Sequence, residues 1–174
     1  LMNFSGELRD VFTLIHEAGH SMHSYYTRRT QPFVYGGHSI FTAEVASTVN
    51  ETLLIHYLLN NAESIDMKKY LINFYIDEFK STLFRQTMFA EFEKIAHETV
   101  ENGGSLTAQY LNEEYDKLNT LYYGPSIEHD EFIQYEWSRI PHFYRAYYVY
   151  QYATGYSAAN AIANRILTGG EAER

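Results

Sequence analysis

Cysteine is missing from the sequence, and proline is rare, with 3 in 174 residues. Without cysteine the chain can form neither disulfide bonds nor thiolate metal sites, so any bound metal must be held by imidazole and carboxylate groups. The lack of cysteine suits a reducing compartment, and we expect a cytoplasmic protein. The sequence also lacks any run near the roughly eighteen apolar residues that a membrane-spanning helix needs, so we expect no membrane partner.

Positive charge is scarce as well. The chain has 13 Lys and Arg residues against 22 Asp and Glu residues, a formal net charge of −9 at pH 7. An acidic chain is repelled by nucleic acid and by anionic membranes, so we expect neither as a partner. The sequence begins without Met, so we interpret it as part of a longer protein. Its first residues show no signal-peptide pattern. Residues 1–174 are long enough for one compact domain with a core.

Apolar residues recur mainly at helical spacing, which predicts a mostly α fold. The predicted helices cover residues 7–27, 40–59, 65–100, 105–122 and 141–167. Ser64 is a candidate N-cap, and Pro141 is placed in the first turn of the last helix. Residues 27–39 are predicted to form a loop, residues 123–141 an irregular segment, and residues 1–4 a short strand end.

The stretch HEAGH, at residues 16–20, indicates a metal site. On a helix, His16 and His20 differ by about 40° of rotation and about 6 Å of rise, so both imidazoles project from one face and can bind one ion. Glu17 is turned away by about 100°, where it can reach a water on the metal without binding the metal itself. This is the arrangement of a zinc hydrolase. The alternative is an ordinary histidine-rich helix without metal.

A catalytic zinc needs a third protein ligand and an open position. His23 lies about 10 Å along the helix from His16, too far for one ion to join it with both motif histidines. His38 is in the predicted loop and remains possible, but Glu44 is the better candidate. In an antiparallel hairpin, His20 and Glu44 both lie about 8 to 12 Å from the looped end.

Two further acidic residues are candidates for hydrogen bonding to a ligand imidazole. Glu51 follows Glu44 by about two helical turns on the same face, and Asp10 could act from the other side. Such contacts fix the tautomer and orientation of a ligand histidine. The alternative for both residues is a solvated helix face.

Three stretches resemble, in the same order, the catalytic region of the oligoendopeptidase F family, a branch of the thimet-oligopeptidase-like zinc peptidases. They are DVFTLIHEAGHSMH, FTAEVASTVNE and PHFYRAYYVYQYATGYSAA. The resemblance implies the helical catalytic lobe of a thermolysin-like His-Glu-x-x-His peptidase, at the C-terminal end of a longer chain. It also implies one zinc per chain bound by His16, His20 and Glu44, with Glu17 activating water. His23 matches the family pattern too, as an outer contact of the site.

The third stretch carries the remaining candidates. In the wider family a His and a Tyr five residues later stabilise the oxyanion of the substrate, and His142 and Tyr147 match them. Tyr150, Tyr152 and Tyr156 are predicted to contact substrate, although they do not align securely with the family's other active-site tyrosines. The alternative is that tyrosines spaced by four form a packed helical stripe.

These patterns predict a zinc-dependent metalloendopeptidase that hydrolyses short oligopeptides with water as nucleophile and Glu17 as general base. The resemblance implies that an N-terminal portion of the same protein completes the substrate channel, so the chain alone is expected to confine substrate poorly. Two alternatives stay open. One is a helical scaffold or peptide-binding module with a structural or vestigial metal site, and the other is a zinc hydrolase of a different substrate, such as a small amide.

Overall fold

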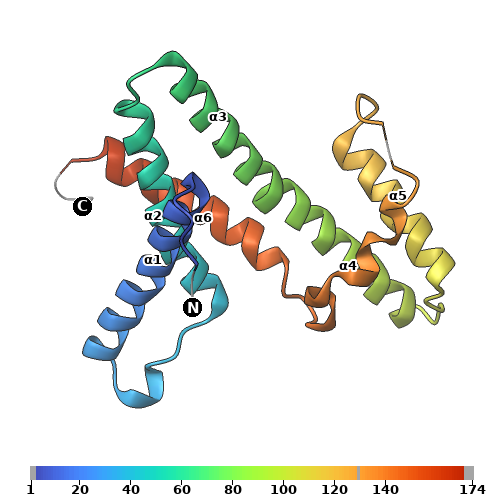
Figure 1. Ribbon diagram of the computed structural model, residues 1–174. Helices are drawn as coiled ribbons and strands as arrows, with labels where there is room; N and C mark the ends of the chain where they lie inside the picture. The colour runs from blue at the N-terminus through green and yellow to red at the C-terminus, as the bar shows by residue number, and fades with distance from the viewer. Residues whose placement is uncertain (1–2, 129, 171–174) are drawn as a thin grey trace. The chain divides into compact units, whose positions relative to one another are not determined.

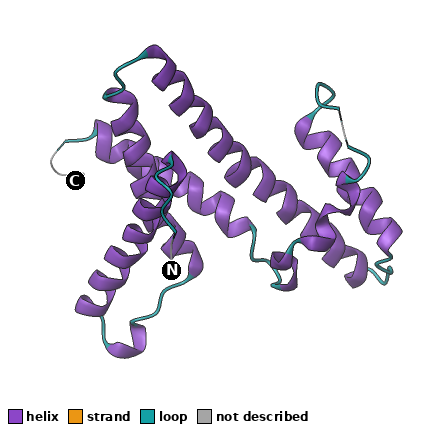
Figure 2. Cartoon of the chain, viewed as in Figure 1, coloured by secondary structure: helices purple, strands orange, loops and turns teal. Residues whose placement is uncertain are grey.

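The computed structural model describes residues 3–128 and 130–170, and these residues form helices joined by turns and loops (Figures 1 and 2). The elements are α1 (Leu8–Thr30), η1 (Phe33–Tyr35), α2 (Ile40–Asn60), α3 (Ile65–Phe79), η2 (Lys80–Phe84), α4 (Arg85–Glu101), α5 (Ala108–Tyr123), η3 (Ile133–Arg139), η4 (Pro141–Tyr144) and α6 (Tyr150–Thr168). No strand occurs in this described part, so the predicted mostly α fold is confirmed. Of the strand expected at residues 1–4, the first two residues lie outside the described part, and residues 3 and 4 have no regular structure.

The described chain groups into two compact units. The first comprises Leu1–Phe79 and Thr154–Arg174, and the second comprises Lys80–Ala153. The expected single domain stays a prediction. In the first unit α1 and α2 form a helical hairpin, and α3 packs against it around Phe12, Ile55 and Leu71. This core holds the hairpin on which the candidate metal ligands lie.

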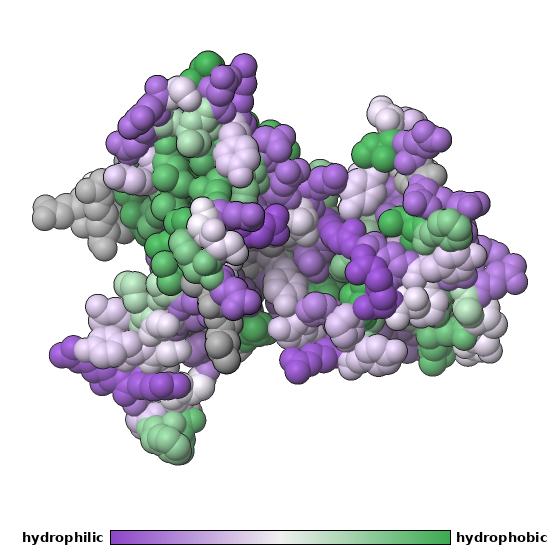
Figure 3. All heavy atoms as spheres, in the orientation of Figure 1, coloured by the Kyte–Doolittle hydropathy of each residue, from purple (hydrophilic) through white to green (hydrophobic). Residues whose placement is uncertain are grey.

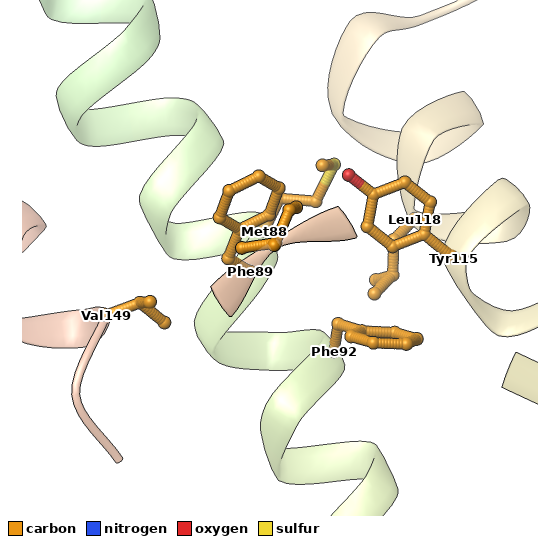
Figure 4. Close-up of a cluster of buried hydrophobic side chains, with 7 residues drawn as sticks. Met88, Phe89, Phe92, Tyr115, Leu118 and Val149 are labelled. Atoms are coloured by element: carbon orange, nitrogen blue, oxygen red, sulfur yellow. The ribbon is translucent and has the colours of Figure 1, made fainter. Parts of the chain in front are cut away.

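The core of the second unit lies where α4 and α5 meet (Figure 4). Its buried side chains are Met88, Phe89, Phe92, Tyr115, Leu118, Ile140 and Val149. Aromatic rings contact one another in this core. The Phe92 ring meets the Tyr115 ring edge to face, with centroids 5.2 Å apart, and its centroid lies 5.3 Å from that of Phe143. Aromatic pairs at such distances add stability beyond the area that they bury. The segment before α6 is anchored in this core through Val149, which is fully buried.

Several helix ends follow local chemistry. The Met67 N–H donates to Ser64 Oγ at 3.1 Å, so the predicted cap of the third helix is confirmed. Thr107 caps α5 by accepting the Tyr110 N–H at 3.2 Å, so this helix begins at Ala108 and not at the predicted residue 105. Gly103 ends α4 with a φ of 82°, a conformation that favours glycine.

Two predicted helices differ from the structure. The helix expected over residues 65–100 is divided by the π-helical turn η2, which adds one residue to a turn and shifts the apolar face. The last helix begins at Tyr150 instead of Pro141, because Tyr147 has a φ of 54° and cannot belong to a right-handed helix. Pro141 does sit in a first turn, but that turn belongs to the short η4.

Surface hydrophobicity is concentrated in part at the connection between α1 and α2. Phe33 is 99 % exposed and Val34 is 79 % exposed. The connection between α1 and α2 lies at the lower left in Figure 1, and the space-filling view, in the same orientation, shows an apolar tip there (Figure 3). Across the described ranges, none of the helices combines the length and apolar character required to cross a membrane.

Candidate metal centre

The two motif histidines project together from α1. Their ring centroids are 4.6 Å apart, and the rings meet edge to face at 88°. Both side chains are partly buried, so they are accessible to an ion and yet held by the helix on which they lie. The helical spacing of four residues therefore produces the shared face that the sequence predicts.

Glu44 of α2 completes a set of three donor groups. One donor atom each from His16, His20 and Glu44 can be chosen so that all three lie within 4.8 Å of one another. His16 Nε2 and Glu44 Oε2 lie 3.7 Å apart. In a tetrahedral zinc site with bonds of about 2.0 Å, ligand atoms lie about 3.3 Å apart, so small side-chain rotations bring this set to zinc geometry. Two imidazoles and one carboxylate form a donor set that fits zinc and leaves a fourth position open.

Gly19 sets the distance between the two helices that carry these groups. A Cβ atom at this position would lie 2.6 Å from Ser47 Cα and 2.8 Å from the carbonyl oxygen of Ala46. Both contacts are to backbone, which cannot rotate away as a side chain can. The glycine of the motif therefore allows α1 and α2 to approach closely enough for Glu44 to reach the histidines. Ser47 is fully buried at this contact, where its small side chain fits.

Helix α6 also packs against α2. Gly155 of α6 lies against the stem of Glu44, since a Cβ built there would be 3.7 Å from Glu44 Cβ. A hydrogen bond from Tyr75 Oη to Asn160 Oδ1, at 2.8 Å, further joins α3 to α6. Glu44 is therefore fixed by packing from two sides of its helix.

Glu51 contacts the first histidine of the motif. His16 Nδ1 lies 3.2 Å from Glu51 Oε1, so this nitrogen can carry the proton and leave Nε2 facing Glu44. The hydrogen bond to Glu51 raises the pKa of His16, partial burial opposes this, and the charges of Glu51, Glu44 and Glu17 add to the rise. A carboxylate at Nδ1 fixes the tautomer and orientation of a metal-binding histidine.

Glu17 is exposed beside this site. Within the described ranges its carboxylate has no hydrogen-bond or ion-pair partner, whereas its backbone oxygen accepts a hydrogen bond from Ser21. The side chain is thus free to bind a water or a substrate group. Its position one residue after His16 turns it away from the ligand face.

His23 and His38 lie together, apart from the three-residue donor set. Their ring centroids are 4.1 Å apart, with an angle of 32° between the planes. Burial, with smaller contributions from His38 and His20, lowers the pKa of His23, which favours its neutral form. This contact connects the loop after η1 to the C-terminal part of α1, next to the metal-binding face.

Asp10 contacts the backbone at the N-terminus of α1. Its Oδ2 atom accepts the backbone N–H of Ser5 at 2.7 Å and that of Glu7 at 3.1 Å. These bonds close the N-terminus of α1 as a capping box. No contact joins Asp10 to a ligand imidazole in the described structure, and its role in orienting one stays a prediction.

An open depression begins at His20 and follows α1. Its volume is about 710 Å³, and it is lined by His20, Ser21, Ser24, Tyr25, Arg28 and Arg29. Hydroxyl groups and two guanidinium groups along one helix face can donate hydrogen bonds to carbonyl and carboxylate oxygens. Hydrogen-bond donors therefore line the surface next to the candidate metal site.

The other predicted catalytic residues belong to the second unit. His142 is exposed and stacks on Tyr148 at 5.8 Å, and it meets Tyr152 edge to face at 6.0 Å. Tyr147 is 50 % exposed, and its ring stacks on His97. Their placement near an open metal position stays a prediction.

The three tyrosines predicted to contact substrate differ in exposure. Tyr150 is 48 % exposed, whereas Tyr152 is partly buried and packs against the core of the second unit. Tyr156 is only 8 % exposed, and its ring lies 6.1 Å from Phe79. Burial raises the pKa of Tyr156, with added contributions from Tyr75 and Glu78. Burial leaves Tyr156 little exposed surface, and its contact with substrate stays a prediction.

Two residues of α4 next to Tyr147 were missed by the sequence interpretation. Glu93 is 5 % exposed and accepts the backbone N–H of Tyr147. His97 follows one helical turn later and stacks on the Tyr147 ring. The available signal was Glu93, directly after Phe92 in the stretch MFAEFEKIA, since a charged residue at a core position calls for a partner.

The family model for peptidase family M3 matches residues 1–174. The chain is 54 % identical over 171 residues to the oligopeptidase PepF of Bacillus subtilis (strain 168), covering 98 % of this chain and 26 % of that protein. It is 52 % identical over 169 residues to the group B oligopeptidase PepB of Streptococcus agalactiae serotype III (strain NEM316), covering 97 % of this chain and 28 % of that protein.

The structure is similar to the crystal structure of oligoendopeptidase-F from Enterococcus faecium. The TM-score is 0.81 at 49 % sequence identity, covering 95 % of this chain and 30 % of that one. The chain thus spans less than a third of the length of each of these relatives. Because the family model covers every residue, and the relatives share about half of the aligned residues, the chain belongs to peptidase family M3.

Proposed function

We propose that this chain carries the zinc centre of a metalloendopeptidase that hydrolyses short oligopeptides. The observation that carries the proposal is the convergence of His16, His20 and Glu44, with donor atoms within 4.8 Å of one another. Two imidazoles and a glutamate are the protein ligands of catalytic zinc in one major class of peptidases. We expect one zinc ion per chain.

When bound, zinc at this site would supply a Lewis acid that lowers the pKa of water and polarises the scissile carbonyl. Glu17 would accept the proton of the attacking water, which its unpaired carboxylate and its place beside His16 support. Glu51 would hold the His16 imidazole with Nδ1 protonated, as the 3.2 Å contact favours. Water is the nucleophile, so no covalent enzyme intermediate forms.

His142 and Tyr147 would donate hydrogen bonds to the carbonyl oxygen as negative charge develops on it. Both side chains are exposed, which suits groups that meet a substrate. The hydroxyl of Tyr147 has no hydrogen-bond partner in the described part of the chain. This role rests on the resemblance to the family's third motif.

The substrate and partner assignments belong to the whole protein. Short peptides fit the names of the relatives, which are oligopeptidases and oligoendopeptidases. The hydrogen-bond donors along the α1 depression support a peptide ligand. The small share of each relative that the chain covers supports an N-terminal portion of the same protein as the partner that completes the channel. The cytoplasmic location, and the absence of nucleic acid and membrane partners, stay predictions.

The test uses the full natural chain. Metal analysis should find one zinc per chain, and cleavage of an internally quenched peptide should stop with a chelator and return with zinc. Glu17→Gln should keep zinc while turnover falls by at least about a hundredfold, because it removes the general base. Glu63→Gln, at an exposed position between α2 and α3, is the control.

Each contrary result has a defined meaning. Bound zinc without peptide cleavage would identify a structural or vestigial site in a helical scaffold. Cleavage of a small amide but not of peptides would identify a zinc hydrolase of another substrate. Normal turnover in Glu17→Gln would remove this residue from the mechanism.

A further inference from the structure

Tyr147 has an unusual backbone conformation. Its φ of 54° is the only positive value at a non-glycine residue in the described ranges. For a residue with a Cβ atom, the left-handed conformation costs about 1 to 2 kcal/mol. A bulky aromatic residue keeps such a conformation only when its surroundings impose it, and such residues cluster at functional sites.

Glu93 of α4 supplies one of the contacts that impose this conformation. Its carboxylate oxygen accepts the backbone N–H of Tyr147, although the two residues are far apart in sequence. Glu93 is only 5 % exposed and follows the buried core residue Phe92 on α4. Burial of a carboxylate is unfavourable unless the carboxylate accepts hydrogen bonds. The bond from the Tyr147 N–H therefore offsets part of the cost of burying Glu93.

His97 supplies the second contact. Its ring centroid lies 4.7 Å from that of Tyr147, and the planes are inclined by 26°. Residues four apart on a helix lie on one face, so Glu93 and His97 act from the same side of α4. One holds the backbone of Tyr147, and the other holds the face of its ring.

The remaining part of Tyr147 is left free. The side chain is 50 % exposed, and its hydroxyl has no partner within the residues that the structure describes. Val149, two residues later, is fully buried and anchors the segment in the core of the second unit. The contacts therefore hold the backbone N–H and the ring of Tyr147 and leave its hydroxyl available.

We propose that Glu93 and His97 are positioning residues that hold Tyr147 with its hydroxyl oriented for the oxyanion. This inference rests on the proposed role of Tyr147 as an oxyanion donor. Positioning of this kind increases turnover because a donor that is already oriented needs no rearrangement when charge develops. Neither residue needs to touch the substrate.

A double-mutant cycle in the full natural chain tests the proposal. Tyr147→Phe should lower kcat about a hundredfold with little change in KM, as loss of one oxyanion donor does. Glu93→Leu should lower kcat about ten- to a hundredfold, because the donor is misplaced. Glu93→Gln keeps a carbonyl oxygen that can accept the Tyr147 N–H, so it should retain most of the turnover. In the Tyr147→Phe background, Glu93→Leu should add almost nothing.

Glu91→Leu is the matched control. Glu91 lies on the same helix and accepts a hydrogen bond from Tyr122 Oη at 2.8 Å, which is a structural contact. This variant should lower stability while kcat stays within about twofold, and its effect should add to that of Tyr147→Phe. Equal losses of kcat in Glu91→Leu and Glu93→Leu would overturn the proposal, because general destabilisation would then explain both.

His97 provides a second variant, which carries the test if Glu93→Leu does not fold. His97→Ala removes the stacked ring and should lower kcat, whereas His97→Phe restores a flat ring and should recover most of it. If His97→Phe and His97→Ala are equally impaired, stacking does not position Tyr147. Unchanged kcat in His97→Ala would also contradict the role of His97.

Hydrogen exchange separates this inference from the proposed function. The amides of residues 145–149 should exchange faster in Glu93→Leu than in the parent or in Glu91→Leu, because the Tyr147 N–H loses its acceptor. Unchanged exchange would overturn the positioning contact alone. Normal kcat in Tyr147→Phe would instead overturn the role of Tyr147 as a donor, and with it the catalytic part of this inference.

Discussion

His16 and Glu51 form a contact across the α1–α2 hairpin, with Nδ1 of the imidazole 3.2 Å from a carboxylate oxygen. The contact gives His16 a defined tautomer before any metal binds. It also makes the charge of His16 part of the stability of the hairpin, because the hydrogen bond to Glu51 raises the pKa of His16.

The stability of the zinc-free protein should therefore depend on Glu51 and on pH. Because the pKa of His16 is raised in the folded state, its protonation stabilises the fold fully at pH values below the unfolded-state pKa of about 6.5. This stabilisation is lost as the pH rises through the folded-state pKa. Glu51→Gln should thus cost about 1 kcal/mol in urea unfolding with a chelator at pH 6, and less at pH 8. Glu63→Gln is the control and should show no such pH dependence. A cost that grows with pH would contradict this assignment.

The assignment of Glu44 as the third ligand can be tested by zinc content. Glu44→Ala should weaken zinc binding by more than about a hundredfold, which exceeds the usual effect of residues that only orient a ligand. His23→Asn and His38→Asn should retain zinc, because these rings pair with each other outside the donor set. Full zinc in Glu44→Ala, with loss in either histidine variant, would reassign the ligand.

Gly19→Ala should disrupt the site without changing any donor group. The new Cβ would meet Ser47 Cα and the Ala46 carbonyl at 2.6 and 2.8 Å, so α1 and α2 would have to separate. We expect a loss of roughly 1 to 3 kcal/mol in unfolding free energy, together with weaker zinc binding measured by competition with a chelator. Gly37→Ala, where an added Cβ meets nothing within 4 Å, is the matched control. Unchanged zinc affinity in Gly19→Ala would show that the helix spacing does not set the site.

Tyr115→Phe should destabilise the second unit and leave zinc binding unchanged. Tyr115 is fully buried and donates to Glu136 Oε2 at 2.7 Å, while Arg85 donates to the other oxygen of Glu136 at 2.6 Å. Loss of the hydroxyl should cost about 1 to 3 kcal/mol, because a buried acceptor loses a partner. Tyr122→Phe, which removes a less buried hydroxyl bonded to Glu91, should cost less. Thermal unfolding and zinc analysis of both variants test this prediction. Loss of zinc in Tyr115→Phe would contradict it.

The helical hairpin was predictable because its determinants are local. The spacing of His16 and His20, and the position of Glu44 relative to the loop, follow from helical geometry, and the structure brings these three side chains together. Their function as zinc ligands remains a proposal. Asp10 could not be placed in this way, because an acidic residue in a first turn serves equally well as a cap.

The conformation before α6 was not predictable from local sequence. Pro141 is compatible with a helix start, and the following residues carry no glycine to indicate a left-handed turn. The turn depends on Glu93, which lies on another helix and accepts the Tyr147 N–H. Likewise, apolar residues occur throughout residues 65–100, so the sequence pattern does not reveal the extra residue of the π-helical turn η2.

The three donor residues and Glu51 all come from one stretch, residues 16–51. The short connection between α1 and α2 joins the two helices on which they lie. Closing a short loop costs little chain entropy, and contacts between residues near in sequence form rapidly during folding. We therefore expect the metal-binding hairpin to be among the first parts of the chain to assemble after synthesis. A zinc ion could then be captured by this hairpin while later segments are still folding, so that loading with metal and completion of the fold proceed together.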